Sequence, residues 1–76
     1  KLVGLDGTAQ KYFYEIDARM PLALIAGSED EGISNAVIRQ MDELAKLPMS
    51  SALESYNVSV ATAMALYEVK RQKLNL

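Results

Sequence analysis

The stretch that decides the fold is PLALIAGSEDEGIS, residues 21–34. It begins with an uninterrupted apolar run, Pro21 to Ala26, which stops at Gly27. Such a run is typical of a strand that is covered on both faces in a parallel sheet. The turn after it leads to Ser34, a residue type that caps the first amides of a helix. A strand, a loop and a helix in this order predict an α/β fold with a mainly parallel sheet and flanking helices.

The segments on either side extend this pattern. Lys1 to Leu5 and Tyr12 to Ile16 are short apolar or aromatic runs, which predict two strands before the decisive stretch. Leu44 to Leu47 predicts another strand after it, ended by Pro48, because proline cannot continue a ladder in the middle of a sheet. From Asn57 to Lys73 the chain lacks glycine and proline and is rich in alanine, leucine and methionine, so we expect a terminal helix.

The first half of this terminal helix is apolar on nearly all sides. A surface helix of a monomer keeps a polar side, so we expect something besides the sheet to cover it. Ala61 and Ala65 lie four residues apart on one stripe, where small side chains would let a neighbouring helix approach closely. A second subunit or another part of the domain would supply that helix.

Composition narrows the possible chemistry. The chain has 76 residues, half of them apolar, which predicts one packed domain. It contains no cysteine and no histidine, which excludes thiol nucleophiles, disulfides, imidazole bases and the usual zinc ligands. We therefore expect no metal site and a cytoplasmic protein. No apolar stretch approaches the ~20 residues that span a bilayer, so we expect no membrane partner.

The charge balance bears on nucleic-acid binding. The net charge is −2, whereas proteins that bind phosphates directly usually carry a concentrated basic face. Lys70, Arg71 and Lys73 cluster at the end of the predicted helix, where cations also complement the helix dipole. Any affinity for nucleic acid should therefore come mostly from residues outside this chain.

The turn from Gly27 to Gly32 is the first candidate site. It follows a buried strand, and ligands of open α/β sheets bind at the carboxyl ends of strands, where glycine lets the backbone approach a ligand. Three carboxylates, Glu29, Asp30 and Glu31, would repel a phosphate and favour a cationic ligand. The same residues are also consistent with an ordinary acidic turn before a helix. A calcium loop fits less well, because the alternating oxygen ligands of an EF-hand are missing.

The second candidate site combines LPM, residues 47–49, with ESYNVS, residues 54–59. Local roles explain most of it: Ser55 or Asn57 caps the terminal helix, and Met49 fills a gap in the packing. These roles do not explain why a hydroxyl and an amide stand two residues apart at the start of a helix, after an apolar strand. Both groups could hold a ligand as well as cap the helix.

The two segments resemble the second and third signature motifs of the SpoU/TrmH branch of the SPOUT RNA methyltransferases. The second motif corresponds to LIAGSE and GIS, residues 24–29 and 32–34. The third corresponds to LPM, ESYNVSVA, LYE and RQ, residues 47–49, 54–61, 66–68 and 71–72. The motifs occur in the family's order and spacing, and the resemblance covers residues 21–73. In the third motif the family usually has glycine at the position of Ser51 and leucine at that of Tyr56.

The resemblance implies a trefoil-knotted α/β domain of which this chain is the carboxy-terminal part. The family's first motif, with an asparagine and an arginine that assists deprotonation, would lie upstream of Lys1, and Arg19 is not in that context. The resemblance also implies a homodimer in which the terminal helix joins the interface. We therefore expect residues 1–76 to be one partial catalytic domain, inactive as an isolated fragment.

The resemblance further implies S-adenosylmethionine as the cofactor and the ribose 2′-hydroxyl of rRNA or tRNA as the methyl acceptor. The residues it places near the reacting groups are Glu29, Ser55 and Asn57. The cofactor-binding residues would be Ala26, Gly27, Glu29, Gly32, Leu47, Met49, Ser55, Tyr56 and Asn57. No residue is expected to bind a metal.

Three functions fit these observations. The first is S-adenosylmethionine-dependent 2′-O-methylation of RNA by a protein that contains this chain. The alternative is a noncatalytic α/β module that dimerises through its terminal helix and binds no cofactor. A third is a relative of the enzyme that keeps the fold and has lost activity. Binding of S-adenosylmethionine separates the module from the enzyme.

Overall fold

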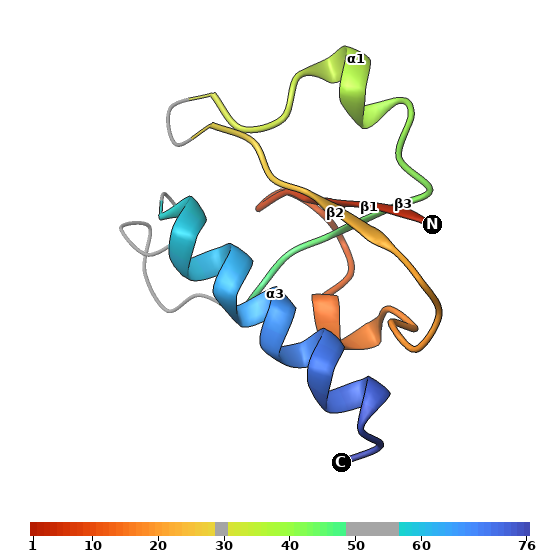
Figure 1. Ribbon diagram of the computed structural model, residues 1–76. Helices are drawn as coiled ribbons and strands as arrows, with labels where there is room; N and C mark the ends of the chain where they lie inside the picture. Colours follow the sequence, from red (N-terminus) through yellow and green to blue (C-terminus); the bar gives the residue numbers. More distant parts are fainter. Residues whose placement is uncertain (29–30, 49–56) are drawn as a thin grey trace.

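A parallel sheet of three short strands forms the centre of the molecule in the computed structural model, which describes residues 1–28, 31–48 and 57–76. The strands are β1 (Leu2–Leu5), β2 (Ala23–Ile25) and β3 (Glu43–Ala45), in the order β2-β1-β3. All three run in the same direction, as Figure 1 shows. The predicted α/β fold with a parallel sheet is therefore confirmed.

Two helices lie on opposite sides of this sheet. α1 (Asn35–Ile38) lies beyond one face, and α3 (Val58–Lys73) covers the other (Figure 1). Each begins after a capping side chain, since Ser34 Oγ accepts a hydrogen bond from Val37 N at 3.3 Å and Asn57 Oδ1 accepts one from Val60 N at 3.0 Å. Such caps satisfy amides that have no partner inside the helix. Both predicted helix starts are confirmed.

The strands bury side chains on both faces, because successive strand residues point to opposite sides. Val3 is completely buried on the α3 side, in a core with the residues Phe13, Ile16, Ala45 and Ala65. Gly4 faces the α1 side, where a Cβ would lie 2.9 Å from the Leu44 side chain and 3.1 Å from that of Met41. The continuous apolar runs of the sequence follow from this two-sided packing.

The strand predicted from Tyr12 to Ile16 is wrong. This segment forms a short 3-10 helix, η1 (Phe13–Glu15), on the α3 side of the sheet. Two contacts favour the turn: the Glu15 carboxylate accepts the Tyr12 amide at 2.7 Å, and the Phe13 amide donates to the carbonyl of Lys46 at 2.7 Å. The turn drives the Phe13 ring into the core, where it is completely buried. Tertiary packing therefore overrides the β-propensity of the aromatic residues.

Two predicted strands are present but shorter than expected. The run from Pro21 to Ala26 pairs only over β2. The strand predicted from Leu44 to Leu47 begins one residue earlier and ends two residues earlier, at Ala45. Lys46 then forms an isolated bridge with Tyr12. The loop that follows β3 is thus attached to the segment that precedes η1.

Ala65 of α3 packs on the protein's own sheet. It is completely buried in the core described above, so the prediction that a neighbouring helix packs on Ala65 is wrong, while the same prediction for the half-buried Ala61 stays a prediction. The large apolar residues that stay exposed on α3 are Val60, Leu66 and Tyr67. Across residues 1–28, 31–48 and 57–76, no helix is both long enough and apolar enough to cross a membrane.

Gln72 links the carboxy-terminal end of α3 to the segment from Ile16 to Ala18 by hydrogen bonds. Its amide nitrogen donates to the carbonyl of Ile16 at 2.9 Å, and its amide oxygen accepts the backbone N–H of Ala18 at 2.8 Å. The same nitrogen also contacts Glu68 Oε2 at 2.7 Å, and Glu68 in turn holds Arg71. One side chain thereby completes two backbone hydrogen bonds of the 16–18 segment and sets the direction of the helix.

Candidate active site at the carboxyl edge of the sheet

The carboxyl ends of β2 and β3 bring the two predicted motifs to one edge of the sheet. Ile25 pairs with Gly4 and Ala45 pairs with Leu5, so the chain leaves β2 and β3 on either side of the end of β1. Neighbouring strands lie about 4.8 Å apart, which separates the two exits by about 10 Å. Ala26 and Gly27 follow one exit and Leu47 follows the other. This edge is where open α/β sheets bind ligands.

Asn57 reaches the same end of the molecule from α3. The helix runs against the strands, so that its first turn lies on the side of the β2–α1 turn and its last turn lies near the beginning of β2 (Figure 1). The Asn57 side chain is exposed and uses its carbonyl oxygen as the helix cap. Its other group is an amide nitrogen, which is a hydrogen-bond donor. Asn57 therefore combines a structural role with a polar group at the edge of the sheet.

The acidic turn is closed at its base by hydrogen bonds of its own backbone. Ser28 and Gly32 form an antiparallel bridge, with the Gly32 amide donating to Ser28 O at 2.9 Å and the Ser28 amide donating to Gly32 O at 3.3 Å. Ser28 Oγ also accepts the amide of Glu31 at 3.0 Å. These hydrogen bonds join the two ends of the turn, close to the carboxyl end of β2. The Glu31 residue in it is exposed.

The two glycines of this turn have different physical roles. At Gly27 a Cβ would overlap the backbone of Gly32 and Ile33, so the missing side chain is required by the chain's own packing. At Gly32 the position of a Cβ is open, but the backbone has φ +69°, in the left-handed region that favours glycine. The sequence had predicted that both glycines allow a ligand to approach. The Cβ position is open at Gly32, whereas at Gly27 the protein's own backbone occupies it.

The segment after β3 is held in position by contacts with the core and with residues 11–13. Leu47 is half-buried and packs against the core, while its neighbour Lys46 donates its amide to Lys11 O at 2.9 Å. The carbonyl of Lys46 accepts the amide of Phe13, as described above. The backbone at Leu47 is therefore fixed in position by residues 11–13, which form the segment that leads into η1.

Four of the predicted site residues lie outside the described part of the chain: Glu29, Met49, Ser55 and Tyr56. Of the nine predicted cofactor-binding residues, the five that the structure describes all belong to the carboxyl edge or to the first residue before α3. The roles of all nine residues in binding a ligand stay predictions. Within residues 1–28, 31–48 and 57–76, no group of three or more acidic residues is arranged to hold a metal ion.

Arg19 lies away from this edge. It stands in the turn before β2, where its guanidinium donates to both carboxylate oxygens of Asp17 at 2.9 and 3.0 Å. These hydrogen bonds hold the pKa of Asp17 well below its ordinary value. Its guanidinium is thus engaged with a neighbour in the chain at the turn before β2.

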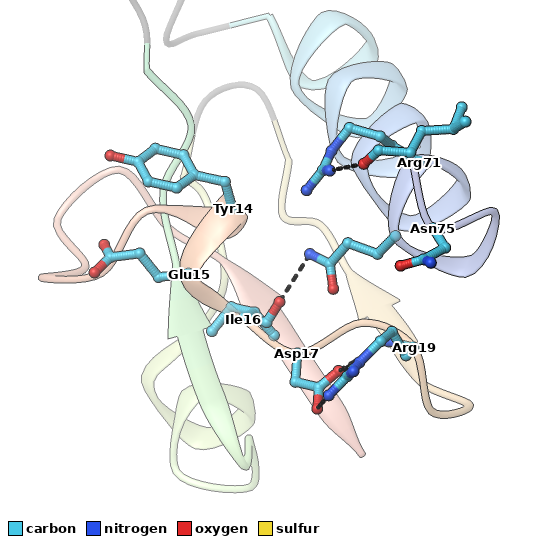
Figure 2. A pocket seen from close by; sticks show the side chains of 9 residues that line it. Tyr14, Glu15, Ile16, Asp17, Arg19, Arg71 and Asn75 are labelled. Carbon is cyan, nitrogen blue, oxygen red and sulfur yellow. Dashed lines mark hydrogen bonds and ion pairs between the residues drawn. The ribbon is translucent and has the colours of Figure 1, made fainter.

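A hollow of about 340 Å³ lies between η1 and the end of α3, where the sequence predicted no site. Its lining residues come from η1 and the segment after it on one side, and from the end of the chain around Arg71 and Asn75 on the other (Figure 2). Between the two sides, Gln72 Nε2 donates to the Ile16 carbonyl. Its charged groups are largely engaged with one another, since Asp17 binds Arg19 and Arg71 binds Glu68. Hydrogen bonds from Arg71 also lower the pKa of Glu68. Residues so far apart in the sequence gave no common signal of this hollow.

Comparison with known proteins assigns the chain to a family. Residues 1–67 match the model of the SpoU rRNA Methylase family. YacO of Bacillus subtilis (strain 168), named as a TrmH family tRNA/rRNA methyltransferase, is 43% identical over 72 residues, which are 95% of this chain and 29% of that protein. The 23S rRNA (guanosine-2'-O-)-methyltransferase RlmB of Pseudomonas aeruginosa is 40% identical over 75 residues, 99% of this chain and 30% of that protein.

A solved structure agrees with this assignment. The SpoU methyltransferase AviRb from Streptomyces viridochromogenes, crystallised in complex with AdoMet, superposes with a TM-score of 0.90 and 32% sequence identity. The match covers 99% of this chain and 30% of AviRb. The chain thus spans about three tenths of the length of the relatives it matches. Its sequence and its fold place it in the SpoU rRNA methylase family.

Proposed function

We propose that this chain is the carboxy-terminal part of an S-adenosylmethionine-dependent methyltransferase that methylates ribose 2′-hydroxyls of rRNA or tRNA. One observation carries the proposal: two family motifs, far apart in the sequence, leave the sheet at the same edge on either side of β1. The relatives support the chemistry, since RlmB is named as a 2'-O-methyltransferase of 23S rRNA and AviRb was crystallised with AdoMet.

The described residues fit the chemistry of S-adenosylmethionine. The ligand combines a cationic sulfonium and amino group with an adenine and a ribose that need polar partners. The exposed Glu31 carboxylate suits the positive charge, and the open surface at Gly32 lets a ligand approach the backbone. We propose that Ala26, Gly27 and Leu47 contribute backbone groups, and that Glu29, Met49, Ser55, Tyr56 and Asn57 complete the site.

When bound, S-adenosylmethionine supplies an electrophilic methyl group. The protein's own contribution in this proposal is to hold the acceptor hydroxyl and the methyl donor in line, an effect worth ~7–11 kcal/mol in well-oriented reactions. Asn57 would orient a polar group of the cofactor or ribose through its amide nitrogen, while its carbonyl oxygen stays on the helix cap. Ser55 and Glu29 are proposed to act beside it.

The rest of the domain is proposed to lie in the parent protein. β2 and β3 are the outer strands here, and within the described residues neither pairs with a further strand on its outer side. Parallel sheets are usually larger and covered on both faces. We propose that preceding chain completes a trefoil-knotted domain and supplies the arginine that assists removal of the hydroxyl proton, and that the protein works in the cytoplasm.

A titration tests the cofactor assignment. The full-length protein should bind S-adenosylmethionine in isothermal calorimetry at micromolar concentrations and transfer a labelled methyl group to rRNA or tRNA. Hydrolysis of the RNA product should release nucleosides that carry the label on the ribose. Binding without transfer would indicate a relative that has lost activity. Absence of binding by the folded protein would instead favour the noncatalytic module.

The proposed protein is a homodimer that uses α3. Val60, Leu66 and Tyr67 are 42%, 56% and 73% exposed, an apolar surface that would be costly to leave in water. At about 100° per residue, Val60 and Tyr67 lie on the side of α3 opposite Ala65, which packs on the sheet, and Leu66 lies on the flank between. A second copy that covers this side would also explain why α3 is apolar beyond its sheet-facing stripe.

Light scattering tests the dimer. Leu66→Lys in the full-length protein should shift the mass toward the monomer, because it places a charge in the proposed interface. Met20→Lys is the matched control, since Met20 is 64% exposed in the turn before β2 and lies outside α3. A dimer that survives Leu66→Lys and Tyr67→Lys together would contradict the use of this face.

A further inference from the structure

Tyr12, directly before η1, and Tyr14, within it, form a stacked pair on the surface. The rings of Tyr12 and Tyr14 have centroids 5.3 Å apart and are tilted by only 9°. The ammonium of Lys46 lies 4.8 Å from the centroid of the Tyr12 ring. Tyr14 remains 58% exposed, although its neighbour Phe13 is completely buried. A large, flat aromatic surface therefore faces solvent at a point where the backbone is held rigidly.

The backbone under this pair is fixed to the proposed active site. Tyr12 bridges Lys46, which is the residue directly before Leu47 in the loop after β3. The Tyr12 amide is held by Glu15, so the spacing of the two rings is set by a closed turn. A ligand stacked on Tyr14 would thus be positioned relative to the carboxyl edge of the sheet.

We propose that Tyr14, supported by Tyr12, is a stacking platform for an unpaired base of the RNA substrate. This inference rests on the proposed function and names a binding element of the same site. Proteins bind unpaired bases by stacking them on exposed aromatic side chains, with nearby cations for the phosphates. An unpaired base exposes its flat face and can stack on Tyr14. A base inside a duplex cannot, because its neighbours in the duplex cover both of its faces.

The surrounding charges suit RNA. Lys46 places its ammonium over the Tyr12 ring, and Lys11, which precedes Tyr12 in the chain, is paired with Glu43. Lys1 and Lys11 bind Glu43, while Lys46 makes no ion pair within the described residues. Its ammonium lies on the Tyr12 side of the stacked pair, where it is available to a phosphate of an RNA strand that crosses this surface.

Tyr14 also borders the hollow of about 340 Å³ between η1 and α3. Its ring extends away from this hollow (Figure 2). A base stacked on Tyr14 would therefore lie on the open surface of the domain, outside the hollow.

Binding of RNA by the full-length protein tests the platform. The probe is a short, fluorescently labelled single-stranded RNA of mixed sequence, compared with the same strand annealed to its complement. Tyr14→Ala should weaken binding of the single strand roughly 5- to 150-fold, the range expected for one lost base stack, and weaken binding of the duplex much less. Tyr14→Phe, which keeps the ring, should bind both RNAs like the unchanged protein.

Two controls separate the platform from the proposed function and from misfolding. Met20→Ala removes an exposed apolar side chain elsewhere and should leave RNA binding unchanged. Binding of S-adenosylmethionine should be the same in Tyr14→Ala as in the unchanged protein. If Tyr14→Ala binds single strands normally, or if single strand and duplex lose affinity equally, the platform is wrong even when methyl transfer is present.

Discussion

Gly27 packs so closely on Gly32 that a Cβ at Gly27 would overlap the carbonyl carbon of Gly32. The two residues enclose the acidic turn, whose ends are tied by the Ser28–Gly32 bridge. One glycine is required for space and the other for its positive φ. This contact holds the proposed cofactor turn in place above the exit of β2, and it makes the turn sensitive to the smallest possible substitutions.

A series of glycine-to-alanine variants tests this relationship. Gly27→Ala must displace backbone, so we expect the largest loss of stability, with lowered soluble yield and a clearly lower Tm. Gly32→Ala meets open space but forces an L-residue into the left-handed region, at a cost of ~1–2 kcal/mol. Gly7→Ala is the control, since a Cβ there would contact nothing within 4 Å. Thermal melts of the full-length proteins should rank Gly7, Gly32 and Gly27 in order of increasing loss.

Replacements of Asn57 separate its cap from its proposed chemistry. Asn57→Asp keeps the oxygen that accepts the Val60 amide and removes the amide nitrogen, so Tm should hardly change while methyl transfer falls strongly. Asn57→Ala should lose ~0.5–2 kcal/mol of stability as well as activity, because the cap is gone. Thermal melts report the loss of the cap, and methyl-transfer rates measured on the same variants report the loss of the proposed role in the site. Full activity in a stable Asn57→Asp protein would leave Asn57 with a capping role alone.

Gln72 should contribute more to stability than its position near the chain end suggests. Gln72→Met keeps the length of the side chain but leaves Ile16 O and Ala18 N without their partner, at a cost of ~1–3 kcal/mol. Lys70→Met is the matched control, because Lys70 is an exposed residue of the same helix. Urea unfolding of the full-length proteins measures both. Equal midpoints for the two variants would mean that α3 is held by its apolar contacts alone.

Glu43 should make stability depend on acid pH. Hydrogen bonds from Lys1 and Lys11 lower the pKa of its carboxyl below the ordinary 4.5. A group whose pKa is lowered by folding stabilises the folded state above its unfolded pKa and loses this contribution as the pH falls through the folded value. The Tm difference between the unchanged protein and Glu43→Gln should therefore be constant near neutral pH and shrink progressively below about pH 4.5.

Salt and a lysine variant check the cause of this pH dependence. Because Lys11 is largely exposed, added salt should reduce the Tm difference at neutral pH. Lys11→Met should lose part of the same stabilisation, and combining it with Glu43→Gln should cost less than the sum of the two single changes. Strict additivity would show that the two side chains do not act on each other.

Local signals in the sequence determined the elements of this protein. The apolar run ending at Gly27 identified a two-sided parallel strand, and Ser34 and Asn57 marked the starts of both helices, because caps and strand burial depend on residues close in the chain. The motif order was sufficient to indicate the family. It also placed both motifs after strands, which in a parallel sheet means one common edge.

Only the tertiary structure decided what those elements touch. Tyr12 to Ile16 has the composition of a strand, yet the core has room for the Phe13 ring and the Lys46 carbonyl accepts its amide, so the segment turns. Ala65 could have faced a second helix but packs on the sheet, and Gly27 is small because Gly32 lies against it. These outcomes depend on contacts between residues far apart in the chain. A local sequence pattern does not show which distant residues will meet or how strongly they will interact.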